Sequence, residues 1–287
     1  MAHTVKTKSE KATLAARRAW CYLVLVVLSF LCLFFFYVLI INSTRTHFEI
    51  QKGFSLMPGK SIITNFRNVI TDANIPVVSG IRNSLLVSAC SAALSVYFSA
   101  LTAYGIYAYN FKFKKAAFAI ILLIMTMPTQ VSALGFLQLI TKMGLKNSFL
   151  PLIIPSIAAP AVFFFMKQYL DASLPMEIVE AARIDGASEA RIFFTIVLRL
   201  LAPAMVTIFL FLFVATWNNF LLPLMMVSSD TLKPVTLGLY GTVSLATFTD
   251  RGALMMGALL GVLPVIVIFL GLQRYWQSGL AAGAVKG

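Results

Sequence analysis

Six long apolar segments separate the polar stretches of this 287-residue chain, and they restrict its fold more than any other sequence feature. A helix that crosses the hydrocarbon core of a bilayer needs about 20 apolar residues. The bilayer core holds no water to pair with backbone polar groups, so such segments must be helical. The sequence therefore predicts an all-α polytopic membrane protein whose six transmembrane helices cover residues 20–41, 85–108, 116–140, 149–170, 200–227 and 253–272.

The composition excludes several other classes of protein. The chain is 60% hydrophobic and 11% charged, whereas soluble domains are about 25% charged. Disorder also requires low hydrophobicity. The net charge of +13 does not indicate nucleic-acid binding, because the basic residues lie between the apolar runs. The apolar core of segment 20–41 exceeds the roughly 7–15 residues of a signal peptide, so we interpret it as a retained span.

The Lys and Arg residues are distributed unevenly between the two sides of the predicted bundle. The tail 1–19, the loops 109–115 and 167–199, and the end from residue 274 carry 14 of the 23 basic residues. The opposite stretches carry nine. Cytoplasmic loops of membrane proteins are enriched in Lys and Arg. We therefore expect both termini and the 167–199 loop to be cytoplasmic.

Prolines lie in four of the predicted spans, and a stripe of small residues lies in the second. Each proline removes a helix hydrogen bond and favours a kink or a break, which is a feature both of cavity-lining helices and of ordinary membrane helices. The prolines are Pro128, Pro155, Pro160, Pro203, Pro223 and Pro264. Small residues every four positions, at Ser91, Ser95, Ser99 and Ala103, predict close packing of the second span against its neighbours.

No residue set indicates bond chemistry. The stretch 53–61 resembles a phosphate-binding P-loop, but five residues instead of four separate its glycines. His3 and His47 have no partners at metal-ligand spacing, and the three cysteines fall inside apolar runs. We expect no catalytic residue, cofactor or metal, and therefore no enzyme.

The loop 171–199 is longer and more acidic than a connection requires. Pro175 predicts a helix start, Gly186 a left-handed helix stop, and Ser188 the cap of a second short helix. This helix–turn–helix could lie on lipid or bind a protein. The cytoplasmic leaflet is negatively charged, so a protein partner suits this loop better. Its acidic residues are Asp171, Glu177, Glu180, Asp185 and Glu189.

These residues carry a resemblance to a known family. Glu180-Ala181-Ala182 and Asp185-Gly186-Ala187 resemble the EAA loop of membrane subunits of ABC importers, specifically the carbohydrate-uptake permeases of the maltose-transporter type. Trp217-Asn218-Asn219-Phe220 in the fifth span and the tail 279–287 are also similar to that family. The chain departs from the family pattern at Arg199, where proline is usual, and at Asn219, where an acidic residue is usual.

The resemblance implies a permease subunit of an ATP-driven, binding-protein-dependent importer for a sugar, with a di- or oligosaccharide as the expected cargo. It implies a second homologous permease subunit, two cytoplasmic ATP-binding subunits and an extracytoplasmic solute-binding protein, working by alternating access. The loop would act as a coupling helix that receives the ATPase movement. The coupling residues would be Glu180, Ala181, Ala182, Asp185 and Gly186.

The resemblance also fixes the expected organisation and location. We expect a multi-pass protein of the bacterial cytoplasmic (inner) membrane. Its permease transmembrane core would cover residues 84–274 and include the coupling loop 171–199 between the fourth and fifth helices. The remaining parts would be a cytoplasmic N-terminal tail, a first transmembrane helix, an extracytoplasmic loop and a cytoplasmic C-terminal tail, at 1–19, 20–41, 42–83 and 275–287.

The sequence suggests a few polar side chains for the sugar path. Aromatic faces and amides suit a neutral sugar, which favours Trp217, Asn218, Asn219 and, beside Pro128, Gln130. The same residues could instead pack between helices, and the partner permease could hold the substrate. The alternative function is a stand-alone secondary carrier or channel for a small polar solute, which would move its cargo without ATPase subunits.

Overall fold

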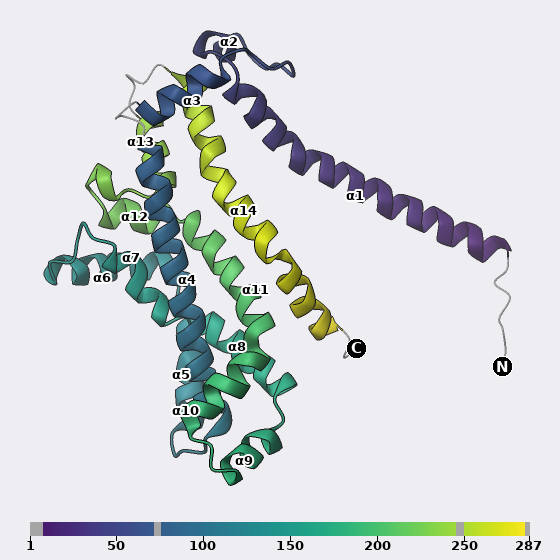
Figure 1. Ribbon diagram of the computed structural model, residues 1–287, viewed down its shortest axis with the longest axis vertical. Coiled ribbons are helices and arrows are strands. Elements are labelled where there is room, and N and C mark those ends of the chain that lie inside the picture. The colour runs from purple at the N-terminus through teal and green to yellow at the C-terminus, as the bar shows by residue number, and fades with distance from the viewer. Residues whose placement is uncertain (1–7, 72–75, 245–249, 285–287) are drawn as a thin grey trace. The chain divides into compact units, whose positions relative to one another are not determined.

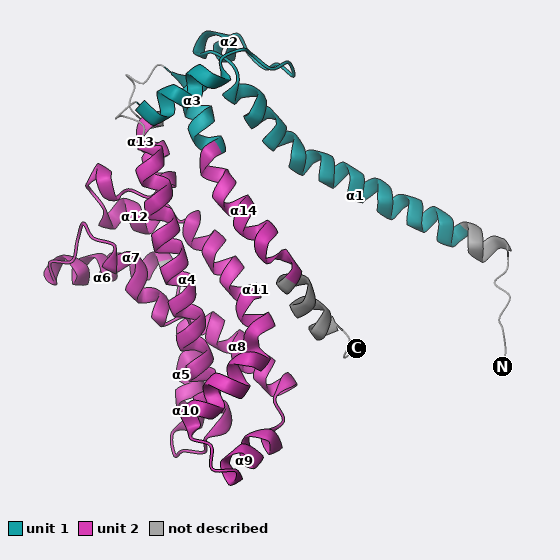
Figure 2. Ribbon diagram, in the orientation of Figure 1, with its two compact units in different colours: residues 1–71, 247–259 teal, residues 72–246, 260–287 magenta. Residues whose placement is uncertain are grey.

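A computed structural model describes residues 8–71, 76–244 and 250–284, and over these residues the chain is built of helices and contains no strand. The described residues form two compact units (Figure 2): 8–71 with 250–259, and 76–244 with 260–284. Five helical stretches are long and apolar enough to cross a membrane, and a bent pair of helices would make a sixth. The ends of the two predicted tails, residues 1–7 and 285–287, lie outside the described residues.

The first unit begins with a long apolar helix (Figure 1). Helix α1, Lys8–Ser43, has 36 residues, and its apolar side chains are largely exposed, as expected of a span whose solvent is lipid. Two short helices follow, α2 at His47–Gln51 and α3 at Ile62–Thr71. The unit also contains the first turns of α14, Arg251–Ala284.

A polar core holds the first unit together. The buried Arg45 guanidinium donates to the carbonyl oxygens of Glu49 and Gly53, the latter at 3.1 Å. The buried Asn65 amide donates to the carbonyl oxygens of Ser43 and Arg45, at 2.8 and 2.9 Å. Helix α14 approaches so closely that a Cβ on Gly252 would lie 2.5 Å from the Arg45 carbonyl oxygen. Only glycine fits there.

The second unit is organised around α4, Val77–Ala108, which packs along α11, Leu198–Trp217, and α8, Pro160–Ser173. The small residues at four-residue spacing on α4 are all buried, with exposed fractions of 3% or less, which confirms the predicted packing stripe. Large side chains such as Met166 and Leu201 fill the core against it.

Breaks interrupt the third, fourth and fifth predicted spans, and the first two of these breaks lie at prolines. Segment 116–140 consists of α5, Lys114–Met125, and α6, Thr129–Lys142, which are bent by 101° with Pro128 between them. Segment 149–170 consists of α7, Leu150–Ile153, the 3₁₀ turn η1, Ile154–Ile157, and α8, which begins at Pro160. Proline therefore breaks the helix at Pro128, Pro155 and Pro160, as predicted, whereas α11 and α14 continue through Pro203 and Pro264.

Several helix boundaries differ from the predicted spans, since α1 begins at Lys8 instead of residue 20 and α14 ends at Ala284 instead of residue 272. The second helix begins at Val77, not at residue 85. The fifth ends at Trp217, and a separate short helix, α12, covers Leu221–Met226. The reason is local: Asn218 donates its side-chain amide to the Val214 carbonyl at 3.0 Å, and the Asn219 side chain accepts from the Leu222 backbone N–H at 3.3 Å. Asparagine side chains that bond the backbone in this way favour helix ends.

The stretch after α12 packs against the start of α4. It contains the 3₁₀ turn η3, Asp230–Leu232, and helix α13, Val235–Ser244. The buried Asn83 amide donates to the carbonyl oxygens of Thr231 and Lys233, at 2.8 and 3.1 Å. The Ser84 hydroxyl accepts from the Val235 backbone N–H at 2.9 Å. These bonds fix the connection between α12 and α13 to one end of the bundle.

Candidate functional site

The loop predicted for coupling folds as two helices joined by a tight turn. Helix α9 covers Met176–Ile184, and α10 covers Glu189–Ile192. Gly186 has φ +79°, the left-handed conformation that favours glycine, and its N–H and that of Ala187 donate to the carbonyls of Arg183 and Ala182. This is the Schellman arrangement that ends a helix. The Ser188 hydroxyl accepts from the Arg191 N–H at 3.3 Å and begins α10.

One face of α9 packs against the core of the second unit, to which it belongs, and the other face is exposed. Val179 is fully buried, and Ala182 and Met176 pack against the same core. On the opposite face Ile184 is 86% exposed, an unusual state for a large apolar side chain outside a lipid-facing span. Helical spacing groups Ile184 with Ala181 and Glu177, which are also exposed.

A polar network fastens α9 to α10 and to the end of α4. The Arg183 Nε atom lies 2.7 Å from the Glu189 carboxylate, and the hydrogen bond to Glu189 raises the pKa of the Arg183 guanidinium. The Tyr104 hydroxyl of α4 donates to the other carboxylate oxygen at 3.0 Å. The guanidinium also lies over the Tyr109 ring, 5.4 Å from its centroid. Tyr107 donates its hydroxyl to the Leu174 carbonyl just before α9.

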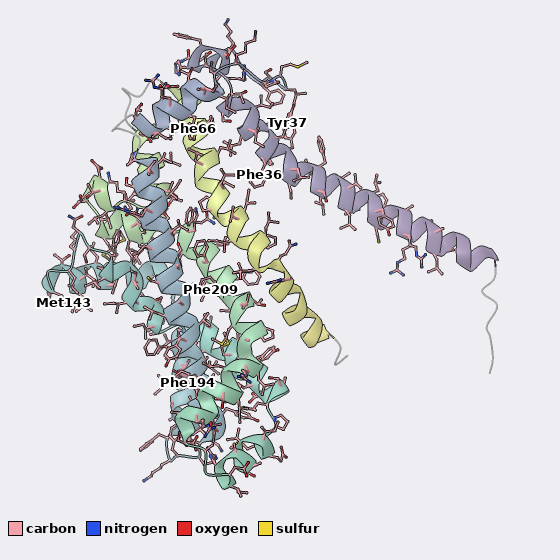
Figure 3. All side chains as sticks on the ribbon, in the orientation of Figure 1. Phe36, Tyr37, Phe66, Met143, Phe194 and Phe209 are labelled. Atoms are coloured by element: carbon pink, nitrogen blue, oxygen red, sulfur yellow. The ribbon has the colours of Figure 1, made fainter. Side chains whose placement is uncertain are left out.

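A short π-helical segment, Phe193–Val197, joins α10 to α11. The buried Phe193 ring lies between those of Tyr97 and Tyr104, with centroid distances of 6.3 and 5.8 Å. Phe194, labelled in Figure 3, is exposed. Helix α11 runs on through the exposed Arg199, so the helix does not break where proline is usual in the family. Helix α10, the π-helical segment and α11 therefore follow one another without an intervening loop.

The structure places the predicted coupling residues on two different surfaces. Glu180, Ala181 and Asp185 are exposed, and a Cβ on Gly186 would meet nothing within 4 Å. Ala182 is half-buried against the core and does not share their open face. Sequence reasoning missed Ile184 and the Arg183–Glu189 pair. The sequence did offer a signal for Ile184, because a large apolar residue stands there close to the acidic residues Glu180 and Asp185.

The three helix breaks border one cleft. It has a volume of about 650 Å³ and lies where α5 ends, α8 begins and α12 begins. Interrupted helices are typical of substrate paths in transporters, since unpaired backbone at membrane depth must line a cavity or be buried in protein. The lining is mostly apolar, and it includes Met125, Met127, Ser132, Phe136, Ala158, Pro160, Asn219 and Leu222.

The structure separates the four residues predicted for the sugar path. Asn219 lines the cleft. Trp217 is buried, stacks on Phe213 of its own helix at a centroid distance of 5.6 Å, and belongs to a core cluster with Ala92 of α4 and Val235 of α13, so it packs between helices. Asn218 is exposed and bonds the backbone of its own helix. Gln130 lies in the first turn of α6 and is exposed, and it is not among the residues that line the cleft.

Comparison with known proteins gives the family. Residues 95–281 match the family described as the binding-protein-dependent transport system inner membrane component. The chain belongs to this family. The match begins within α4, includes α9 and α10 and the residues around the cleft, and ends within α14.

Individual relatives and a solved structure agree with this assignment. The chain is 33% identical to the arabinooligosaccharides transport system permease protein AraQ of Halalkalibacterium halodurans, over 91% of this chain and 93% of that protein. It is 29% identical to the trehalose/maltose transport system permease protein MalG of Thermococcus litoralis, over 91% and 94%. The crystal structure of a bacterial ABC transporter that imports the acidic polysaccharide alginate has the same fold, with a TM-score of 0.79 at 17% identity over 94% and 98% of the two chains.

Proposed function

We propose that this protein is the membrane-spanning permease subunit of an ATP-driven, binding-protein-dependent importer for a di- or oligosaccharide. The family membership and the saccharide-transport names of its relatives support this function. The protein would form half of the translocation path together with a second, homologous permease subunit. A solute-binding protein would deliver the sugar outside, and both termini would be cytoplasmic in a bacterial inner membrane.

The proposed coupling mechanism rests on the exposed face of α9. Ile184 is an apolar side chain that the rest of this subunit leaves 86% exposed, and acidic residues surround it. Such a patch suits a partner with an apolar pocket and a basic rim. We assign that partner as one of two cytoplasmic ATP-binding subunits. Its movement would reach α11 through α10 and the π-helical segment, which connect to α11 without a break.

The cleft at the helix breaks is the proposed surface for the sugar. Asn219 supplies an amide that can bond sugar hydroxyls, and methionine and phenylalanine supply apolar contact for the faces of the pyranose rings. ATP-driven closure of the ATPase pair would rock the permease halves so that this surface faces alternately outward and inward. The chain itself would break no covalent bond.

The test replaces Ile184 in the assembled transporter. We expect Ile184→Glu to abolish ATP-driven sugar uptake in proteoliposomes and to weaken co-purification of the ATPase, because the charge cannot enter an apolar pocket. Ile184→Leu is the matched control and should retain uptake, and Lys112→Glu controls for an unrelated polar loop. Wild-type ATPase binding and uptake in Ile184→Glu would refute the coupling role. Sugar movement by the isolated chain without ATPase would favour a stand-alone carrier.

A further inference from the structure

The loop between α2 and α3 has an apolar tip that the transport mechanism does not use. Its residues are Gly53-Phe54-Ser55-Leu56-Met57-Pro58, the stretch whose sequence resembles an interrupted P-loop. The side chains of Phe54, Leu56 and Met57 are 66%, 51% and 76% exposed. Three large apolar side chains within four residues of one loop tip form a patch that water solvates poorly.

The tip folds back along α1 towards the middle of the predicted span. The Phe54 ring lies 6.0 Å from the Phe34 ring, centroid to centroid. The Tyr37 hydroxyl donates to the Leu56 carbonyl at 2.7 Å, and Figure 3 labels Tyr37 on α1. The apolar stretch of α1 ends at Ile41. With about 1.5 Å of rise per residue, Tyr37 lies about 6 Å and Phe34 about 10 Å inside that end.

Several backbone groups of the loop have hydrogen-bond partners within the first unit. Unpaired backbone groups in hydrocarbon cost several kcal/mol each, on the order of the values for amide transfer. The Gly53 carbonyl accepts from the Arg45 guanidinium at 3.1 Å, and the Met57 N–H donates to the Ser55 hydroxyl at 3.0 Å. The Gly59 N–H donates to the Thr44 hydroxyl at 2.8 Å. These bonds pair part of the loop backbone, while the apolar side chains of Phe54, Leu56 and Met57 stay exposed.

The charges flanking the tip also fit a bilayer surface. Residues 53–59 contain no charged side chain, whereas Lys52 and Lys60 stand on either side of this stretch. Lysine next to a buried apolar segment extends its ammonium group to the headgroup phosphates. The patch is also continuous with the exposed apolar surface of α1, which is a candidate membrane span.

We propose that the 53–58 loop is a lipid-inserted anchor, with Phe54, Leu56 and Met57 seated among the acyl chains of the outer leaflet beside α1. The anchor would hold the polar core around Arg45 and Asn65 at a fixed depth at the bilayer surface. This proposal rests on α1 crossing the membrane and not on the identity of the cargo, so it can fail or hold independently of the transport function.

The experiment measures the depth of the loop in the purified transporter reconstituted in phosphatidylcholine nanodiscs. A nitroxide is attached at Met57→Cys after Cys21, Cys32 and Cys90 have been replaced by serine, and collision rates with oxygen and with a water-soluble nickel chelate are compared. The matched control is the exposed Lys52→Cys. We expect the oxygen-to-nickel ratio at Met57→Cys to exceed the control by about threefold or more, since oxygen concentrates in the acyl region.

Other results would overturn the anchor. A ratio equal to that of Lys52→Cys would mean that the tip lies no deeper than the flanking lysine, and therefore outside the acyl chains. Low collision rates with both reagents would mean that a partner subunit covers it. If the oxygen-to-nickel ratio at Met57→Cys falls only when the solute-binding protein is added, the patch is a docking surface for that protein. Phe54→Cys gives a second, independent position, and lipid insertion requires the same high ratio there.

Discussion

Substitutions in the hydrogen-bond network that connects α9 to α4 are expected to lower the unfolding free energy by unequal amounts. Tyr104 is 3% exposed, and its hydroxyl has the Glu189 carboxylate as its hydrogen-bond acceptor in the structure. The side chains of Arg183 and Glu189 are 31% and 43% exposed, so their ion pair is largely screened by water. The buried hydroxyl, and not the ion pair, should therefore dominate the energetics.

The structure sets the order of the expected losses in unfolding free energy. Arg183→Met removes a screened pair worth about 0.2–1 kcal/mol. Tyr104→Phe removes one hydrogen bond to a carboxylate that keeps its guanidinium partner, about 1 kcal/mol. Glu189→Leu removes both contacts and leaves the Tyr104 hydroxyl buried without its acceptor, which costs about 2–3 kcal/mol. Glu189→Gln keeps an acceptor for Tyr104 and should cost less than Glu189→Leu.

The assay is reversible unfolding of the subunit in mixed micelles of increasing SDS content, combined with ATP hydrolysis per sugar transported in proteoliposomes. A double-mutant cycle of Tyr104→Phe with Glu189→Leu should show a coupling free energy of about 1 kcal/mol. Glu189→Leu should also raise the ATP used per sugar, because α9 is then held less firmly to the bundle. Additive losses in the cycle, or an Arg183→Met loss as large as that of Glu189→Leu, would refute the reasoning.

Three further predictions follow from close contacts. Gly252→Ala should destabilise the protein by about 2 kcal/mol, because its Cβ would lie 2.5 Å from a backbone oxygen. Gly105→Ala is the control, since its Cβ would meet nothing within 4 Å, and it should be neutral or stabilising by about 0.5 kcal/mol. Thermal unfolding compares the two variants, and equal shifts in unfolding temperature would contradict the contact. Asn83→Leu should leave two carbonyls without their donor and increase protease cleavage within 228–244, and an unchanged cleavage pattern would show that these bonds do not hold that stretch. Asn219→Leu should reduce sugar uptake at least about tenfold with ATPase binding intact, because it removes a polar group from the cleft, and normal uptake would exclude the cleft as the sugar surface.

Much of the local structure could be predicted from the sequence because it depends on neighbouring residues. Hydropathy over windows of about 20 residues located the apolar helices, and Pro128 and Pro160 located two of the breaks. Gly186 and Ser188 fixed the turn between α9 and α10, because a left-handed residue and a capping hydroxyl act within one helical turn. The pattern of Glu180 to Gly186 also pointed to the family.

Only the tertiary structure decided which side chains meet across the chain. Tyr104 and Glu189 are 85 residues apart in sequence, and their contact depends on the register in which α4 packs against the loop. Packing also buried Trp217 and brought its near neighbour Asn219 to the cleft. The composition and residue spacing of a segment determine which secondary structure that segment can form alone. Contacts between distant segments arise from side-chain shape and close packing, which no local pattern contains.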